Sequence, residues 1–185
     1  MRIVAGQFRG RALTPLGKGD QAAHLRPTTD RVRESLFNVL CSGRFGDPIT
    51  GYRVLDLFAG TGALGLEALS RGASHVTFVD DGKTAQTLIR KNIQICQSSE
   101  LTTVLKMDAT ELAQNPDAAY DLIFMDPPYG KAMGEQAFTQ LQTGNWIAED
   151  AILVWEENKS MPAPKGYVHL DTRKYGDTYL TILQA

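Results

Sequence analysis

The chain has 185 residues and a net charge of −2, and its hydrophobic content of 43% is ordinary for one compact globular domain with a substantial core. It contains no apolar run of about 18 residues and no signal-peptide pattern, so no membrane span is expected and a cytoplasmic protein is favoured. Two distant cysteines and three scattered histidines predict reduced thiols and no metal site.

The basic residues gather near the beginning of the chain. Residues 1–33 hold seven basic and two acidic residues, a local charge of +5, whereas the remainder carries −7. This asymmetry favours a basic N-terminal element that meets phosphates, although a solvated arm without a partner would have the same charge. We expect an N-terminal extension over residues 1–45, packed on a larger domain over residues 46–185.

The extension is predicted to form a hairpin and a helix. Short strands over residues 2–5 and 11–14 surround a glycine-punctuated turn, and residues 17–25 have the composition of a loop. A helix is expected to begin around residues 27–30, where Pro, Thr and Asp precede apolar residues at helical spacing.

From residue 52 onward, strands alternate with helices, which implies βαβ units and a parallel sheet. The expected elements are strand 53–58, helix 63–70, strand 75–80, helix 83–96, strand 103–107, a short helix near 109–114, strand 120–126, helix 134–142 and strand 151–156. Strands 167–172 and 178–183 fit a final antiparallel hairpin. We therefore predict a Rossmann-like α/β fold with a seven-stranded, mostly parallel sheet.

A glycine-rich loop follows the first strand of this alternation. Gly60, Gly62 and Gly65 form the pattern G-x-G-x-x-G between a strand and a helix, which NAD, FAD and S-adenosylmethionine sites share. Asp56, four residues before Gly60, would repel a pyrophosphate. Its carboxylate could instead hold the ammonium of a methionine moiety, which favours S-adenosylmethionine as the cofactor.

Acids also end the next two strands. Asp80 lies 20 residues after Gly60, where an acid is expected to accept from a ribose hydroxyl, although Asp81 beside it could do the same. Asp108 could reach an adenine amino group, or each acid could simply be a solvated carboxylate or a helix cap. The candidate cofactor-binding residues are Asp56, Phe58, Gly60, Thr61, Gly62, Asp80, Asp108 and Ala109.

The sequence Asp126-Pro127-Pro128-Tyr129 follows a buried apolar strand, at the sheet edge where ligands bind in α/β folds. An exocyclic amine of a nucleic-acid base is a poor nucleophile because its lone pair is delocalised into the ring. The Asp126 carboxylate and the Pro127 carbonyl could localise that lone pair by accepting its N–H groups. Tyr129 could stack on the base. A simple Pro-Pro turn is the alternative interpretation of these four residues.

These segments together resemble class I S-adenosylmethionine-dependent methyltransferases, and more narrowly the 16S rRNA guanine-N2 methyltransferases of the ribosomal small-subunit methyltransferase D family. The resemblance covers nearly the whole chain. It rests on Arg2-Ile3-Val4-Ala5-Gly6, Arg9-Gly10-Arg11, Arg26-Pro27-Thr28, residues 30–38, residues 56–65, residues 126–129 and Tyr175-Gly176-Asp177-Thr178.

The resemblance implies methylation of one guanine N2 in 16S rRNA, within the small ribosomal subunit or its assembly intermediate. It implies catalytic roles for Asp126, Pro127 and Tyr129. It further implies that basic residues contact RNA phosphates or help to close the site, namely Arg9, Arg11, Arg26 and Arg33. Such enzymes often have Glu where this chain has Asp80. We expect a monomer without a membrane partner.

Three other functions fit parts of the pattern. A DNA adenine-N6 methyltransferase would use the same four residues, but such enzymes generally carry an added segment that reads base edges, and only about 45 N-terminal residues remain for it here. A nucleotide-binding oxidoreductase would share the glycine loop, but Asp56 and the Pro-Pro-Tyr turn argue against it. A non-catalytic RNA-binding module would not need both Asp126 and the glycine loop.

Overall fold

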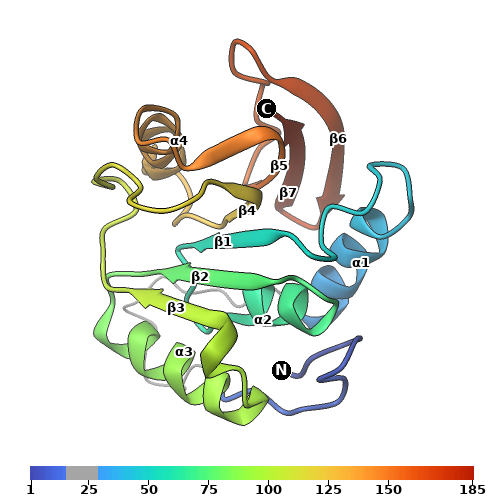
Figure 1. Ribbon diagram of the computed structural model, residues 1–185. Helices are drawn as coiled ribbons and strands as arrows, with labels where there is room; N and C mark the ends of the chain where they lie inside the picture. Colours follow the sequence, from blue (N-terminus) through green and yellow to red (C-terminus); the bar gives the residue numbers. More distant parts are fainter. Residues whose placement is uncertain (16–28) are drawn as a thin grey trace.

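The computed structural model describes residues 1–15 and 29–185, and one seven-stranded sheet lies at its centre (Figure 1). The strands are β1 (Arg53–Leu57), β2 (His75–Val79), β3 (Thr102–Leu105), β4 (Tyr120–Met125), β5 (Ile147–Glu157), β6 (Val168–Tyr175) and β7 (Thr178–Gln184). The helices are α1 (Asp30–Leu40), α2 (Ala63–Ser70), α3 (Lys83–Cys96), a short 3-10 helix η2 (Ser99–Leu101) and α4 (Met133–Thr143).

The strand order is β3-β2-β1-β4-β5-β7-β6. Strands β1 to β5 pair in parallel, and β7 pairs antiparallel with both β5 and β6. This confirms the predicted α/β fold with a mostly parallel sheet and a C-terminal antiparallel hairpin. The order reverses between β1 and β4, and in open α/β sheets ligands bind beyond the strand ends at such a reversal.

Apolar cores cover both faces of the sheet. On one face, α1, α2 and α3 pack against the strands, and the rings of Phe37 and Phe124 lie 5.7 Å apart. On the other face, α4 and the β3–β4 connection pack over residues such as Ile123 and Trp155. Figure 1 shows α2 and α3 on one side of the sheet and α4 on the other. Burial from both sides explains the uninterrupted apolar run of β4.

The helix predicted near residues 109–114 is wrong, because this segment forms a turn and an extended connection. The Asp108 carboxylate accepts a hydrogen bond from the Thr110 amide at 2.8 Å, which closes a local turn. Farther along, the Ala113 carbonyl accepts from the Trp146 indole and the Asn115 amide donates to Gly144. Backbone groups that a helix would need are therefore paired with the neighbouring α4–β5 connection.

Strand β5 begins at Ile147, four residues before the predicted start. Tyr120 pairs with Ile147, and the register then shifts so that Leu122 pairs with Ile152. Only the part of β5 from Ala151 onward is buried throughout. Hydrophobic patterning finds the buried half of such a strand and misses the half that lies before the irregularity.

The N-terminal arm, defined here as residues 1–13, contains one antiparallel bridge between Arg2 and Ala12 in place of the two predicted strands. Three of its residues enter the core, namely Ile3, Phe8 and Leu13. Helix α1 begins at Asp30, and the Thr29 hydroxyl caps it by accepting from the Val32 amide at 3.3 Å. Residues 17–25 lie outside the described residues, and the division of the chain at residue 45 stays a prediction.

None of the helices in the described part of the chain is long and apolar enough to cross a membrane.

Candidate active site

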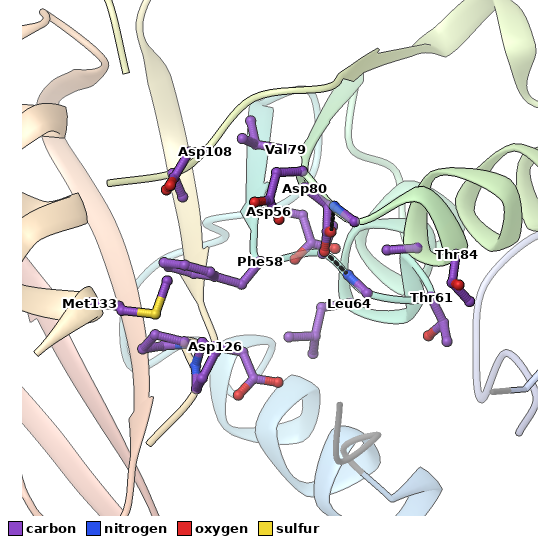
Figure 2. A pocket seen from close by; sticks show the side chains of 18 of the residues that line it. Asp56, Phe58, Thr61, Leu64, Val79, Asp80, Thr84, Asp108, Asp126 and Met133 are labelled. Carbon is purple, nitrogen blue, oxygen red and sulfur yellow. Dashed lines mark hydrogen bonds between the residues drawn. The ribbon is translucent and has the colours of Figure 1, made fainter. Parts of the chain in front are cut away.

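A cavity of about 610 Å³ lies at the carboxyl ends of β1, β2, β3 and β4 (Figure 2). Four carboxylates from the ends of these strands line it: Asp56, Asp80, Asp108 and Asp126. Figure 2 shows Phe58 between Asp108 and Asp126 in this view, with Met133 across from its ring. An acid-rich cavity of this kind suits a ligand that carries positive charge.

Most of the predicted cofactor and acceptor residues meet in this one cavity. Its walls include Asp56, Phe58, Gly60, Thr61, Asp80, Asp108, Ala109, Asp126, Pro127 and Tyr129. Gly62 does not line the cavity but belongs to the loop that forms one wall, where its backbone has a φ of 74°. The predicted cofactor-binding residues and the predicted acceptor residues therefore line the same cavity.

Asp56 is the most buried acid of the site, with 2% of its surface exposed. Its Oδ2 atom accepts a hydrogen bond from the Gly65 amide at 2.9 Å, across the glycine loop. The pKa of Asp56 is raised to about 8, mainly because the carboxyl is buried. The hydrogen bond from the Gly65 amide partly offsets this rise, and the nearby Asp80 carboxylate makes a smaller contribution to it. A cationic group bound beside Asp56 would favour its ionised form.

Asp80 ties the end of β2 to two loops. Its Oδ2 accepts from the Gly60 amide and its Oδ1 from the Gly82 amide, both at 2.9 Å. Burial raises the pKa of Asp80 more than these two amides lower it. Asp81, the neighbour that could have taken its place, is exposed at the cavity rim. Asp80 is therefore the acid held against the glycine loop.

The backbone around the glycine loop leaves little room for other residues. A Cβ atom at Gly65 would lie 2.5 Å from Cε1 of Phe78, so α2 packs against β2 more closely than a side chain there would allow. Phe58, directly before the loop, adopts a φ of 56°, an uncommon conformation for an aromatic residue. Strained backbone of this kind concentrates at ligand sites. The loop thus forms a cradle that fits close approach of a ligand.

Tyr129, which the sequence predicts to stack on the acceptor base, lines the cavity and is held by hydrogen bonds at its hydroxyl. The hydroxyl donates to Oε1 of Glu156 at 2.8 Å, and Oγ1 of Thr178 lies 3.0 Å away. Burial raises the pKa of Tyr129 above its usual value, with a smaller contribution from the Glu156 carboxylate. The side chain therefore remains a neutral phenol, and Tyr129 is one of the residues that line the cavity.

Comparison with known proteins identifies the family. The family described as Conserved hypothetical protein 95 matches residues 1–184. Ribosomal RNA small subunit methyltransferase D of Haemophilus influenzae is 37% identical over 181 residues, which cover 95% of this chain and 89% of that protein. The chain belongs to this methyltransferase family.

One further relative and two solved structures are consistent with this assignment. The Escherichia coli K12 protein of that name is 37% identical over 157 residues, or 84% of this chain and 74% of that protein. A solved structure of yhhF from Escherichia coli, described as a proposed methyltransferase, is 32% identical with a TM-score of 0.84, and the match covers 100% of this chain and 97% of that one. HI0767 from Haemophilus influenzae, a proposed methylase, is 34% identical with a TM-score of 0.77 over 99% and 97%.

In this member of the ribosomal RNA small subunit methyltransferase D family, the basic residues expected to meet RNA have different surroundings. Arg9 is exposed on the N-terminal arm. Arg11 lies over the Phe8 ring, 4.8 Å from its centroid, and donates to the Ile95 carbonyl at 3.0 Å. Arg26 lies outside the described residues. Of the two arginines that the structure describes here, Arg9 is exposed and Arg11 is partly buried.

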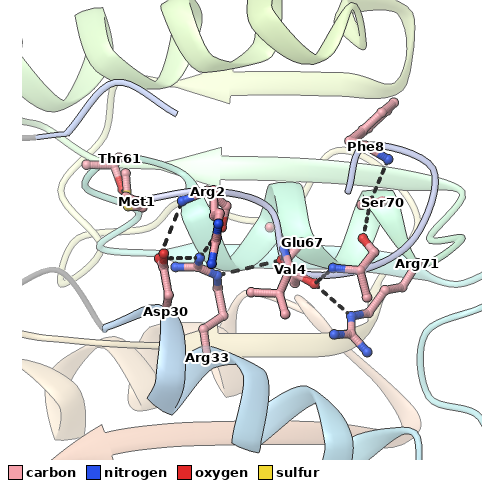
Figure 3. Close-up of polar contacts among 12 residues, drawn as sticks. Met1, Arg2, Val4, Phe8, Asp30, Arg33, Thr61, Glu67, Ser70 and Arg71 are labelled. Carbon is pink, nitrogen blue, oxygen red and sulfur yellow. Dashed lines mark hydrogen bonds and ion pairs between the residues drawn. The ribbon is translucent and has the colours of Figure 1, made fainter. Parts of the chain in front are cut away.

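Arg33 does not fit the expected phosphate contact, because its side chain is 0% exposed. It pairs with Asp30 at 2.8 Å, lies 3.7 Å from Glu67 and donates to the Arg2 carbonyl. Figure 3 shows this cluster between α1, α2 and the N-terminal arm. The sequence pattern alone offers no reason to bury an arginine here, since its fully buried partner Glu67 lies 34 positions away.

Several residues of the site escaped prediction from the sequence. Met1 and Met133 line the cavity, and Thr61 donates to the Met1 sulfur at 3.6 Å. Glu156 and Thr178 contact the Tyr129 hydroxyl. In the sequence, Glu156 follows an apolar run and cannot be told apart from a solvated acid at the end of a strand. Of these residues, only Thr178 could have been found from the sequence, because it belongs to a segment on which the family resemblance rests.

The described residues contain no group of three or more His, Cys, Asp and Glu side chains that could hold a metal ion.

Proposed function

We propose that this protein transfers a methyl group from S-adenosylmethionine to the exocyclic N2 amine of one guanine in 16S rRNA. The substrate would be the small ribosomal subunit or its assembly intermediate, in the cytoplasm. One observation carries the proposal: Asp126, Pro127 and Tyr129 line the same cavity as the glycine loop and the acids Asp56 and Asp80. Donor and acceptor halves of a methyl-transfer site would then face each other.

The donor half has the chemistry for a cationic cofactor. Asp56 would hold the methionine ammonium, Asp80 a ribose hydroxyl, and Asp108 with Ala109 the adenine. The close packing at Gly65 and the five aspartates that line the cavity fit such a ligand. When bound, S-adenosylmethionine supplies a methyl group on a sulfonium, which is a good leaving group. The main task of the protein is then to align the acceptor.

The acceptor half would activate and orient the amine. The Asp126 carboxylate would accept one N–H group and the Pro127 carbonyl the other, which localises the lone pair on nitrogen. Stacking on the Tyr129 ring would stabilise the base by about 1–3 kcal/mol. As the new nitrogen–carbon bond forms, the amine loses a proton, and Asp126 is the carboxylate of the motif that would accept it.

RNA would be recognised mainly through its backbone and shape. Arg9 and Arg11 on the N-terminal arm would contact phosphates, as Arg26 would, and the protein would act as a monomer. Arg33 would instead support the arm from inside, because it is buried against Asp30 and Glu67.

The deciding experiment is methylation of small subunits that lack this modification, followed by mass mapping of the modified nucleotide. We expect one methyl group on one guanine N2 of 16S rRNA. Naked duplex DNA serves as the parallel substrate, and methylation of its adenines would replace the proposal with the DNA alternative. Calorimetry that detects NADH binding but no S-adenosylhomocysteine binding would rule out the methyltransferase role altogether.

A further inference from the structure

The C-terminal hairpin reaches the acceptor side of the cavity through one hydroxyl group. Thr178 begins β7 directly after the β6–β7 turn, and its Oγ1 atom lies 3.0 Å from the Tyr129 hydroxyl. Glu156, 7% exposed near the end of β5, accepts from the same hydroxyl at 2.8 Å. Strands β5 and β7, which pair antiparallel with each other, thus hold the hydroxyl of a tyrosine that belongs to the β4–α4 connection.

The strand before this turn also makes a side-chain contact, with helix α1. Tyr175 ends β6 and pairs with Thr178 across the turn. Its hydroxyl lies 2.6 Å from the Ser35 hydroxyl of α1. The β6–β7 turn is therefore linked to α1 through Tyr175 and to the cavity wall through Thr178. A turn held at both strand ends gives Tyr129 a rigid partner.

The hydroxyl contacts limit how the Tyr129 ring can move. A tyrosine hydroxyl lies at the far end of the side chain, so anchoring it restricts rotation about the first side-chain torsion. The O–H bond lies in the plane of the ring, so two partners in fixed positions also favour one ring plane. Burial keeps the pKa of Tyr129 above its usual value, so the donated hydrogen bond to Glu156 persists across the neutral pH range.

We propose that Glu156 and Thr178 are positioning residues that hold the Tyr129 ring in the plane where the acceptor base stacks. This inference rests on the proposed function. It assigns the C-terminal antiparallel hairpin a part in acceptor binding that is separate from cofactor binding. The carboxyl ends of β1, β2 and β3 would then hold the methyl donor, and Glu156 of β5 with Thr178 of the hairpin would set the geometry of the acceptor.

The test compares Tyr129→Phe, Thr178→Val and the double variant in steady-state methylation of small subunits. Tyr129→Phe keeps the ring and removes only the hydroxyl. We expect it to raise KM for small subunits about tenfold, since a hydrogen bond to a charged group is lost, with kcat within about twofold. Thr178→Val should act in the same direction, and the double variant should add little to Tyr129→Phe because both remove the same contact.

Two controls separate positioning from general stability. Thr181→Val removes a buried hydroxyl from the same strand, and the partner of this hydroxyl is the Met161 amide, at 3.1 Å, in place of Tyr129. It should leave KM for small subunits unchanged even if the protein unfolds at lower temperature. Glu156→Gln keeps an oxygen that can accept from the Tyr129 hydroxyl, so it should preserve KM where Glu156→Ala raises it.

Binding of S-adenosylhomocysteine, measured by calorimetry, should be the same in all variants. An unchanged KM in Tyr129→Phe, or equal effects of Thr181→Val and Thr178→Val, would overturn the inference while the proposed function stands. Absence of small-subunit methylation by the unsubstituted protein would overturn the proposed function, and the inference with it.

Discussion

Asp126 is the side chain on which the proposed acceptor chemistry depends most directly. It lies in the cavity wall beside Pro127 and Tyr129, directly after β4. We expect Asp126→Ala to lower kcat by about 100-fold or more, the range for loss of a group that handles a proton in the transition state. Affinity for S-adenosylhomocysteine should stay within a few-fold, because the acids assigned to the cofactor remain.

A filter-binding assay of methyl transfer, combined with calorimetry, measures both quantities. Asp81→Ala is the matched control, since Asp81 lies at the exposed rim of the same cavity. If Asp126→Ala instead abolishes S-adenosylhomocysteine binding, Asp126 belongs to the cofactor half and its assigned role is wrong.

Asp56 should make cofactor binding depend on pH. Burial raises its pKa from 3.8 to about 8, so the free protein holds this carboxyl mostly protonated at neutral pH. An ammonium group bound beside it favours the ionised form, so binding releases a proton. Affinity for S-adenosylhomocysteine should therefore increase with pH, approaching tenfold per pH unit below about pH 8 and levelling off above it.

Calorimetry in buffers of different ionisation enthalpy counts the released protons directly. Asp56→Asn cannot ionise, so it should bind more weakly and lose most of this pH dependence. An affinity that falls between about pH 6 and pH 8 would contradict the assignment of Asp56 to a cationic group.

At the scale of elements, Glu67 joins α2 to α1 and to the N-terminal arm. Its carboxylate accepts from the amides of Val4 and Ala5 at 2.8 and 3.0 Å and pairs with Arg71 at 2.9 Å. Arg33 approaches from α1, and neither side chain of this pair is exposed. Figure 3 shows these contacts meeting at one point. The cluster fixes how the arm lies against α1 and α2.

Removing Glu67 should destabilise the protein strongly. Glu67→Ala leaves the Arg33 guanidinium buried without this partner, which costs about 3–5 kcal/mol of the free energy of unfolding. Urea denaturation measures the difference. Replacing both residues, with Glu67→Leu and Arg33→Met, should recover part of the loss because the fully buried Arg33 charge is removed together with its partner.

The exposed Glu100→Ala is the control for this measurement and should change stability by less than about 0.5 kcal/mol. A Glu67→Ala variant as stable as this control would show that the arm docks through its apolar residues Ile3, Phe8 and Leu13 alone.

At the scale of the whole molecule, charge is separated between the N-terminal arm and the rest of the chain. The arm is held rigidly on α2, so Arg9 is presented from a fixed position. We expect Arg9→Ala to weaken small-subunit binding and to reduce the slope of log affinity against log salt by about 0.7–0.9, as for one lost phosphate contact.

Lys165→Ala is the matched control for Arg9→Ala. Lys165 is exposed before Tyr167, which packs on Phe138 of α4 on the opposite face of the sheet. Filter binding at several salt concentrations measures both slopes. Equal slopes for the two variants would mean that the arm does not contact RNA phosphates.

Much of this architecture could be predicted from local patterns. The strand–helix alternation follows from apolar runs of a few residues and from the glycines that end them, and helices α2 and α3 have the predicted bounds. The helix prediction for residues 109–114 is wrong because backbone groups of this segment pair with the Asp108 carboxylate and the Trp146 indole. Local helical spacing contains no information about such distant partners.

The sequence by itself determined the fold class, the glycine loop with its acids and the acceptor motif, because each depends on residues within one short window. Tertiary structure alone decided that these windows open into one cavity. It also decided that Arg33 turns inward and that Tyr129 is held by Glu156 and Thr178, 27 and 49 positions away. Contacts between residues so far apart depend on strand order and packing, which local periodicity does not encode.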